Sequence, residues 1–106
     1  MKIGITVYSN DPETVWNAFR IANFSRSMGD EVRIFLLGKG VEIDSIRSEK
    51  FNVPEQVETY LKDNGRLYAC GTCLQVRNLA PSKTYIVGTL KELYAIITES
   101  DKVVTF

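Results

Sequence analysis

The stretch Val32-Arg33-Ile34-Phe35-Leu36-Leu37 decides the fold class, because five of its six residues are apolar and follow one another almost without interruption. A strand of this composition is covered on both faces, as in parallel sheets whose strands are joined by crossover helices. The stretch therefore predicts an interior strand of a parallel sheet.

The residues before this strand complete a βαβ unit. Alternating apolar residues over positions 3–7 predict a first strand. Asp11 follows as a helix N-cap and Pro12 as the first helical residue. Apolar residues at helical spacing then predict a helix over residues 12–28, which ends before Gly29.

The rest of the chain repeats the alternation of helices and strands. The expected elements are one short helix within residues 38–53, a helix from Pro54 to Asn64-Gly65, a strand over 66–69, a short helix that breaks before Pro81, a strand over 84–87, a helix over 90–97 and a strand over 102–106. Five strands and four or five helices predict an α/β protein: a three-layer α/β/α domain, residues 1–106, with a mainly parallel five-stranded sheet.

Charge and hydropathy narrow the class of partner. Thirteen basic and thirteen acidic residues cancel without a basic cluster, so the footprint of a nucleic-acid-binding protein is missing. No apolar stretch approaches the roughly 20 residues of a membrane span, and the first residues lack a signal-peptide pattern. We therefore expect a cytoplasmic protein that binds neither nucleic acid nor membranes, and whose partners are small molecules or proteins.

The only two cysteines lie in Cys70-Gly71-Thr72-Cys73, directly after a short apolar strand and at the expected start of a helix. A thiol there lies among unpaired backbone N–H groups, which favour its anionic, nucleophilic form. In a reducing compartment a CxxC pair is more often catalytic, redox-active or metal-binding than a structural disulfide. The segment predicts sulfur chemistry, with Cys70 and Cys73 as reactive residues supported by the amides of Gly71 and Thr72.

Four further residues are candidates for the same site. Arg77 lies one helical turn after Cys73 and could support anionic sulfur if its side chain folds back. Tyr8, Ser9 and Asn10 follow the first strand, and the carboxyl ends of parallel strands lie at one edge of the sheet. These three could line the sulfur pocket, although loop solvation is the commoner role of such residues.

The sequence also removes several kinds of site. The chain has no histidine, which excludes Ser-His-Asp and Cys-His catalysis within it. Two cysteines without histidine cannot complete the usual four-ligand zinc site, so no metal is predicted. Gly38-Lys39-Gly40 lacks the pattern of a nucleotide fingerprint, and no cofactor is predicted, while flavin binding stays open.

The segment from Leu67 to Arg77 resembles the DsrE/DsrF/TusD-like family, and the likeness covers the whole chain, including Lys2–Val7, Val32–Leu37 and the ending Ser100–Phe106. The resemblance implies a flavodoxin-like α/β/α fold and assembly into trimers or hexamers. It also implies a cysteine that carries persulfide sulfur between proteins, as in the characterised relatives.

The resemblance singles out Cys70 of the two cysteines. In the family's sulfur carriers the cysteine precedes, by about two helical turns, an arginine that a glycine follows. Cys70 stands at this distance from Arg77, and Asn78 occupies the glycine's place, where it tolerates left-handed backbone angles. Cys73 is then an extra thiol.

Three functions follow as alternatives. Sulfur relay makes Cys70 the nucleophile and persulfide site, Cys73 an auxiliary or resolving thiol, and the partners sulfur donor and acceptor proteins or small persulfides. A thiol-disulfide oxidoreductase would use both cysteines as a redox pair. A non-enzymatic, oligomeric binding module would leave both thiols unreactive, as small residues that pack a helix start.

Overall fold

The computed structural model describes residues 1–106, apart from the side chain of Asp63. One sheet contains the strands β1 (Lys2–Val7), β2 (Glu31–Leu36), β3 (Arg66–Cys70), β4 (Ile86–Gly88) and β5 (Lys102–Thr105). Their order is β4-β3-β2-β1-β5, and every neighbouring pair is parallel. The predicted five-stranded parallel sheet is confirmed.

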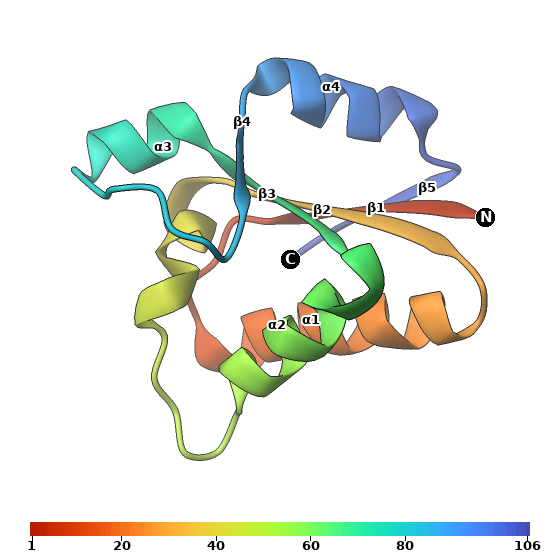
Figure 1. Ribbon diagram of the computed structural model, residues 1–106, viewed down its shortest axis with the longest axis horizontal. Coiled ribbons are helices and arrows are strands. Elements are labelled where there is room, and N and C mark those ends of the chain that lie inside the picture. Colours follow the sequence, from red (N-terminus) through yellow and green to blue (C-terminus); the bar gives the residue numbers. More distant parts are fainter.

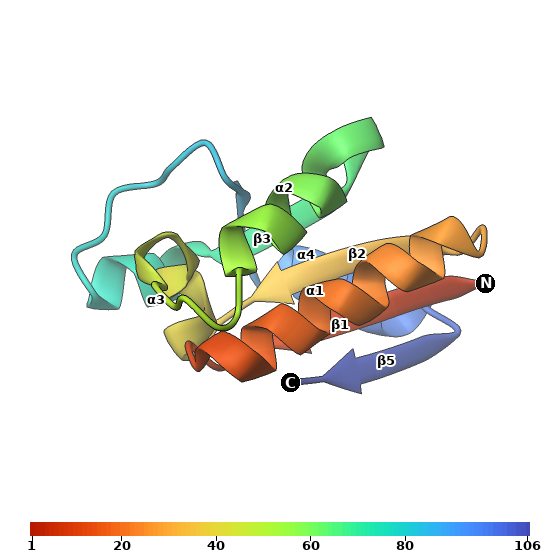
Figure 2. The ribbon, with the colours of Figure 1, turned by 90° about the horizontal axis from the view of Figure 1, so that it is seen from below.

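Helices cover both faces of this sheet. They are α1 (Pro12–Ser27), α2 (Val53–Leu61), α3 (Gly71–Val76) and α4 (Leu90–Glu99), with two short 3₁₀ helices, η1 (Gly38–Ser45) and η2 (Lys62–Asn64). Helices α1 and α2 lie on one face, and α3 and α4 lie on the other, which gives the predicted three layers (Figures 1 and 2). No helix in the described part of the chain is long and apolar enough to cross a membrane.

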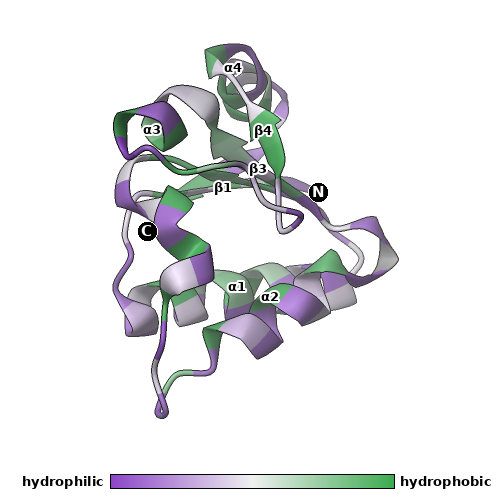
Figure 3. Ribbon diagram, turned by 60° about the vertical axis from the view of Figure 1, so that its left-hand side comes forward, coloured by the Kyte–Doolittle hydropathy of each residue, from purple (hydrophilic) through white to green (hydrophobic). Residues whose placement is uncertain are grey.

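Strand β2 lies in the middle of the sheet, as its apolar sequence predicts. Ile34, Phe35 and Leu36 are fully buried. Tyr60 of α2 is also fully buried, and its hydroxyl lies 3.0 Å from the Val32 carbonyl oxygen and 2.7 Å from that of Arg66. Helix α2 is thereby fixed to the middle strands, and the strands show mainly hydrophobic colours in Figure 3.

Helix α4 makes the one connection that crosses the whole sheet, from β4 at one edge to β5 at the other. A capping box between Thr89 and Glu92 starts the helix. Ile96 packs against Gly4, where an added Cβ would lie 2.7 Å from the Ile96 Cγ2 atom. This close packing explains why α4 can lie directly over β1.

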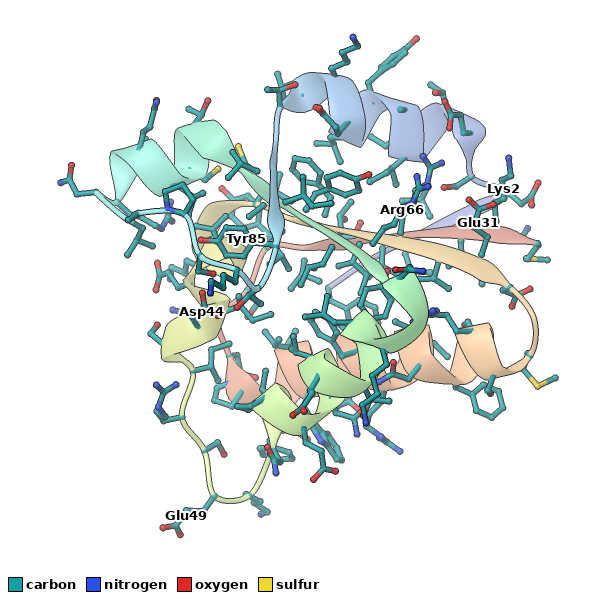
Figure 4. All side chains as sticks on the ribbon, viewed as in Figure 1. Lys2, Glu31, Asp44, Glu49, Arg66 and Tyr85 are labelled. Atoms are coloured by element: carbon teal, nitrogen blue, oxygen red, sulfur yellow. The ribbon has the colours of Figure 1, made fainter. Side chains whose placement is uncertain are left out.

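Several element boundaries differ from the sequence prediction. The helix expected within residues 38–53 is the 3₁₀ helix η1, and Val53, one residue before the expected Pro54, begins α2. Strand β4 begins at Ile86 rather than at residue 84. The hydroxyls of Ser82 and Thr84 both donate to the carboxylate of Asp44, which holds this segment as a loop beside η1 (Figure 4).

Candidate functional site

An open hollow of about 720 Å³ lies at the carboxyl ends of the strands, between α3 and the start of α4. Its lining is mainly apolar and consists of Tyr8, Leu37, Cys70, Gly71, Thr72, Cys73, Gln75, Val87, Gly88, Thr89, Leu90 and Lys91. The structure thus brings together both cysteines, the two residues between them and Tyr8. The charged residues that begin β1, β2 and β3 lie at the opposite end of the sheet; they are Lys2, Glu31 and Arg66 (Figure 4).

Cys70 is the last residue of β3 and the N-cap of α3. Its Sγ atom accepts a hydrogen bond from the backbone N–H of Cys73 over 3.5 Å. The residue is only 8% exposed, because it ends a strand that packs between β2 and β4, yet it lines the hollow. A partner must therefore reach Cys70 through the hollow rather than across an open surface.

Cys73, in the first turn of α3, is more exposed than Cys70. Its Sγ atom accepts a hydrogen bond from the backbone N–H of Gly38 over 3.2 Å. Burial raises the pKa of the Cys73 thiol, the Gly38 amide opposes that rise, and nearby Cys70 adds to it. The Cys73 thiol is therefore harder to ionise than a free cysteine thiol.

Tyr8 lines the hollow beside Gly38, whose backbone amide binds Cys73. The φ angle of Gly38 is +57°, a conformation that L side chains rarely adopt. The Tyr8 ring covers this glycine, since an added Cβ would lie 2.6 Å from the Tyr8 Cζ atom. The Tyr8 backbone N–H donates to the Phe106 carbonyl over 2.9 Å, so the residue after β5 helps to hold Tyr8 in place.

Arg77 lies against η1 instead of folding back over the sulfur atoms. Its Nε atom donates to the Glu42 carboxylate over 2.8 Å, and its Nη1 atom donates to the Cys73 carbonyl over 3.2 Å. The Asn10 amide donates to the other Glu42 oxygen over 3.1 Å. These hydrogen bonds lower the pKa of Glu42 and keep it ionised, and the bond from Arg77 has the larger effect. The charge of Arg77 lowers the pKa of Cys73, but less than the Gly38 amide does.

Two more of the predicted residues can be placed. Ser9 is not among the residues that line the hollow, and its hydroxyl oxygen accepts the N–H of Asp11 over 2.9 Å. Asn78 has a φ angle of +53°, the left-handed conformation expected where the family has glycine. Sequence reasoning missed Glu42, because nothing in its own segment marks it: its partners come from loops far along the chain.

The described residues hold no group of three or more Cys, Asp or Glu side chains placed to bind a metal ion. The hollow itself offers two sulfur atoms, backbone amides, two threonine hydroxyls, the tyrosine hydroxyl of Tyr8, one amide side chain and one lysine. Such a set suits reactions of sulfur better than those that need a strong acid or base.

Comparison with known proteins identifies the family. The model of the DsrE/DsrF-like family matches residues 1–106. The chain belongs to the DsrE/DsrF-like family. An uncharacterised protein of Methanocaldococcus jannaschii is 36% identical over 102 residues, which cover 89% of this chain and 88% of that protein. An uncharacterised protein of Methanopyrus kandleri is 31% identical over 101 residues, with coverage of 89% and 83%.

Solved structures share the DsrE-like fold. The ychN protein of E. coli superimposes with a TM-score of 0.86 at 26% identity, covering 100% of this chain and 99% of that one. A conserved protein of unknown function from Bacteroides thetaiotaomicron gives a TM-score of 0.77 at 18% identity, covering 99% and 94%, which supports the fold alone. Membership of the DsrE/DsrF-like family suggests a role related to sulfur relay.

Proposed function

We propose that this protein carries sulfane sulfur as a persulfide on Cys70, in a cytoplasmic sulfur relay. The observation that carries the proposal is the shared hollow: both thiols line one opening, and each sulfur accepts a backbone N–H. Amide donors of this kind stabilise a thiolate or a persulfide anion. The wall around the two sulfur atoms is mainly apolar.

The transfer would take two displacements. The Cys70 thiolate attacks the outer sulfur of a donor persulfide, R–S–SH; the new bond joins Cys70 Sγ to that sulfur, and R–S⁻ leaves. An acceptor thiolate then attacks the outer sulfur of Cys70–S–SH, and the Cys70 thiolate leaves. Cys73 is suited to a later or auxiliary step, because burial raises its pKa and makes its thiolate harder to form.

The proximity of the two thiols favours a second candidate, a thiol-disulfide oxidoreductase. Cys70 is close enough to Cys73 to raise its pKa, and the two stand three residues apart at a helix start. In this case the Cys73 thiolate would attack Cys70 Sγ of the persulfide, and HS⁻ would leave as the Cys70–Cys73 disulfide forms. The cysteines would lose two electrons, and the outer sulfur would gain them.

We also propose that copies of the chain associate through the outer face of α4. Leu90, Tyr94 and Ile97 are 73%, 70% and 49% exposed and recur at helical spacing, and Val87 of β4 is exposed nearby. The Tyr94→Lys variant should have a smaller mass by light scattering than the wild-type protein. Equal masses would contradict association through this face.

Mass spectrometry after anaerobic incubation with a small persulfide donor tests the function. The chain has only two cysteines, so Cys70→Ser and Cys73→Ser each leave one thiol to modify. Relay requires one extra sulfur on Cys70, kept in Cys73→Ser and transferable to an acceptor thiol. A Cys70–Cys73 disulfide with released hydrosulfide would support the oxidoreductase instead, and unmodified thiols would contradict both.

A further inference from the structure

Two contacts join the cysteine-bearing helix α3 to the 3₁₀ helix η1. The first is the hydrogen bond from the Gly38 amide to Cys73 Sγ, and the second is the ion pair between Glu42 and Arg77. Gly38 begins η1 and Glu42 follows four residues later, at a kink within the same segment, so both contacts come from η1. Arg77 also binds the carbonyl of Cys73, which extends the second contact to the same residue as the first.

This arrangement holds the Cys73 thiol from two directions. Its sulfur is bound by Gly38 on the η1 side, while its carbonyl is bound by an arginine that Glu42 anchors. The Glu42–Arg77 pair is half-buried, with side-chain exposures of 31% and 26%, so water screens it less than an open surface pair. Asn10 fixes the second oxygen of the same carboxylate.

Closing a Cys70–Cys73 disulfide must disturb this arrangement. Cys70 already lies close enough to raise the pKa of Cys73, but forming the S–S bond would draw the Cys73 sulfur off the Gly38 amide, and the first turn of α3 would adjust with it. The ion pair opposes that adjustment because it ties the end of α3 to η1. Without the ion pair, Cys73 would be freer to make the move.

We propose that Glu42 is a positioning residue that keeps the cysteine pair in its dithiol form by holding Arg77, and through it Cys73, against η1. The inference rests on the proposed function in one respect: it explains why a persulfide on Cys70 would persist until an acceptor arrives. With Cys73 held at Gly38, its attack on Cys70–S–SH, which would release HS⁻, is disfavoured. Glu42 thus favours relay over internal reduction.

The experiment measures the disulfide directly and needs no sulfur donor. Reduced protein is equilibrated with mixtures of oxidised and reduced glutathione; two thiols and one glutathione disulfide give the Cys70–Cys73 disulfide and two reduced glutathiones. Alkylation and intact mass give the equilibrium constant for wild type, Glu42→Ala, Arg77→Ala and the double variant. Glu99→Ala is the matched control, since it breaks the Arg33–Glu99 ion pair of 3.1 Å away from the cysteines.

We expect Glu42→Ala and Arg77→Ala each to raise the equilibrium constant for disulfide formation about three- to tenfold, in the lower part of the range measured for coupled side chains. The double variant should match the single ones, because the two residues act as a unit. Glu42→Gln, which keeps a hydrogen-bond acceptor, should restore much of the wild-type value. Glu99→Ala should leave the constant unchanged.

Equal constants in wild type and both single variants would overturn the proposal, as would a rise in Glu99→Ala of the same size or an additive double variant. If Glu42→Ala does not fold, Asn10→Ala removes only one hydrogen bond from the carboxylate and should give a smaller rise; no rise would refute the role of Glu42. A changed disulfide constant without persulfide loading would sustain this inference and reject the relay. Persulfide transfer with an unchanged disulfide constant would support the relay and reject this inference.

Discussion

The Tyr60→Phe substitution removes a single buried hydroxyl and leaves the packing of the ring in place. The hydroxyl lies 3.0 Å from the Val32 carbonyl of β2 and 2.7 Å from the Arg66 carbonyl of β3. Tyr60 is fully buried, so water cannot replace the lost donor. We therefore expect a lower free energy of unfolding with little change in fold.

The size of the loss follows from removing this buried donor. Leaving a buried hydrogen-bonding group without its partner costs about 1–3 kcal/mol. The unfolding entropy near 60 °C is about 2.1 cal/mol/K per residue, or roughly 0.22 kcal/mol/K for a chain of 106 residues. The melting temperature should therefore fall by about 5–13 °C.

Urea unfolding and calorimetry would measure this loss. Tyr8→Phe is the control, because Tyr8 is 60% exposed and the substitution keeps its ring. It should change the unfolding free energy by less than about 0.5 kcal/mol. A Tyr60→Phe protein as stable as this control would refute the view that the hydroxyl holds α2 to the sheet.

The same residue gives a prediction for alkaline pH. Burial raises the pKa of Tyr60 well above its ordinary value of 10.0. Since the unfolded chain releases this proton first, the stability from the neutral hydroxyl is complete below about pH 10 and is lost as the pH rises further. The stability difference between wild type and Tyr60→Phe should be constant from neutral pH to about pH 9 and shrink above pH 10.

Three further results are expected. Gly38→Ala places a Cβ against the Tyr8 ring at a φ angle of +57°. It should lower the free energy of unfolding in urea by at least about 1 kcal/mol and speed the alkylation of Cys73. Wild-type values for both would contradict the close packing. In the wild-type protein, the alkylation rate of Cys73, followed by peptide mapping, should rise with pH and reach its midpoint above the pKa of a free thiol, roughly 8.5, because burial raises the pKa of Cys73. A midpoint below that value would be inconsistent with the site's electrostatics. Thr89→Ala removes the capping box of α4 and should destabilise the protein by about 1 kcal/mol, whereas an unchanged urea midpoint would show that the cap is dispensable.

Much of the fold could be predicted from local sequence. The apolar run of β2 indicated a doubly covered strand, and the Asp11-Pro12 pair indicated the start of α1, because burial and capping depend on neighbouring residues. The end of the loop before β4 could not be predicted in this way. It depends on Asp44, which receives hydrogen bonds from Ser82 and Thr84, 38 and 40 residues away.

In the candidate site too, features set by local sequence could be predicted, and contacts between distant residues could not. The position of Cys70 at the end of a strand followed from the strand pattern, and the structure shows both cysteines in one hollow. The orientation of Arg77 did not follow, because its partner Glu42 lies 35 residues earlier in the chain, in a segment with a weak helical pattern. Contacts between distant polar residues leave no periodic signal in the sequence.

The pairing of β5 with β1 has a consequence for local unfolding. Thr6 and Thr105 share a hydrogen bond across 99 residues of sequence, and all four residues of β5 are exposed. Such a strand separates from its sheet at a lower free energy than the buried strands do. Because the Tyr8 N–H donates to the carbonyl of Phe106, each opening of this edge also releases one anchor of the ring over Gly38. Hydrogen exchange at the Tyr8 amide should therefore report how often the wall beside Cys73 loosens.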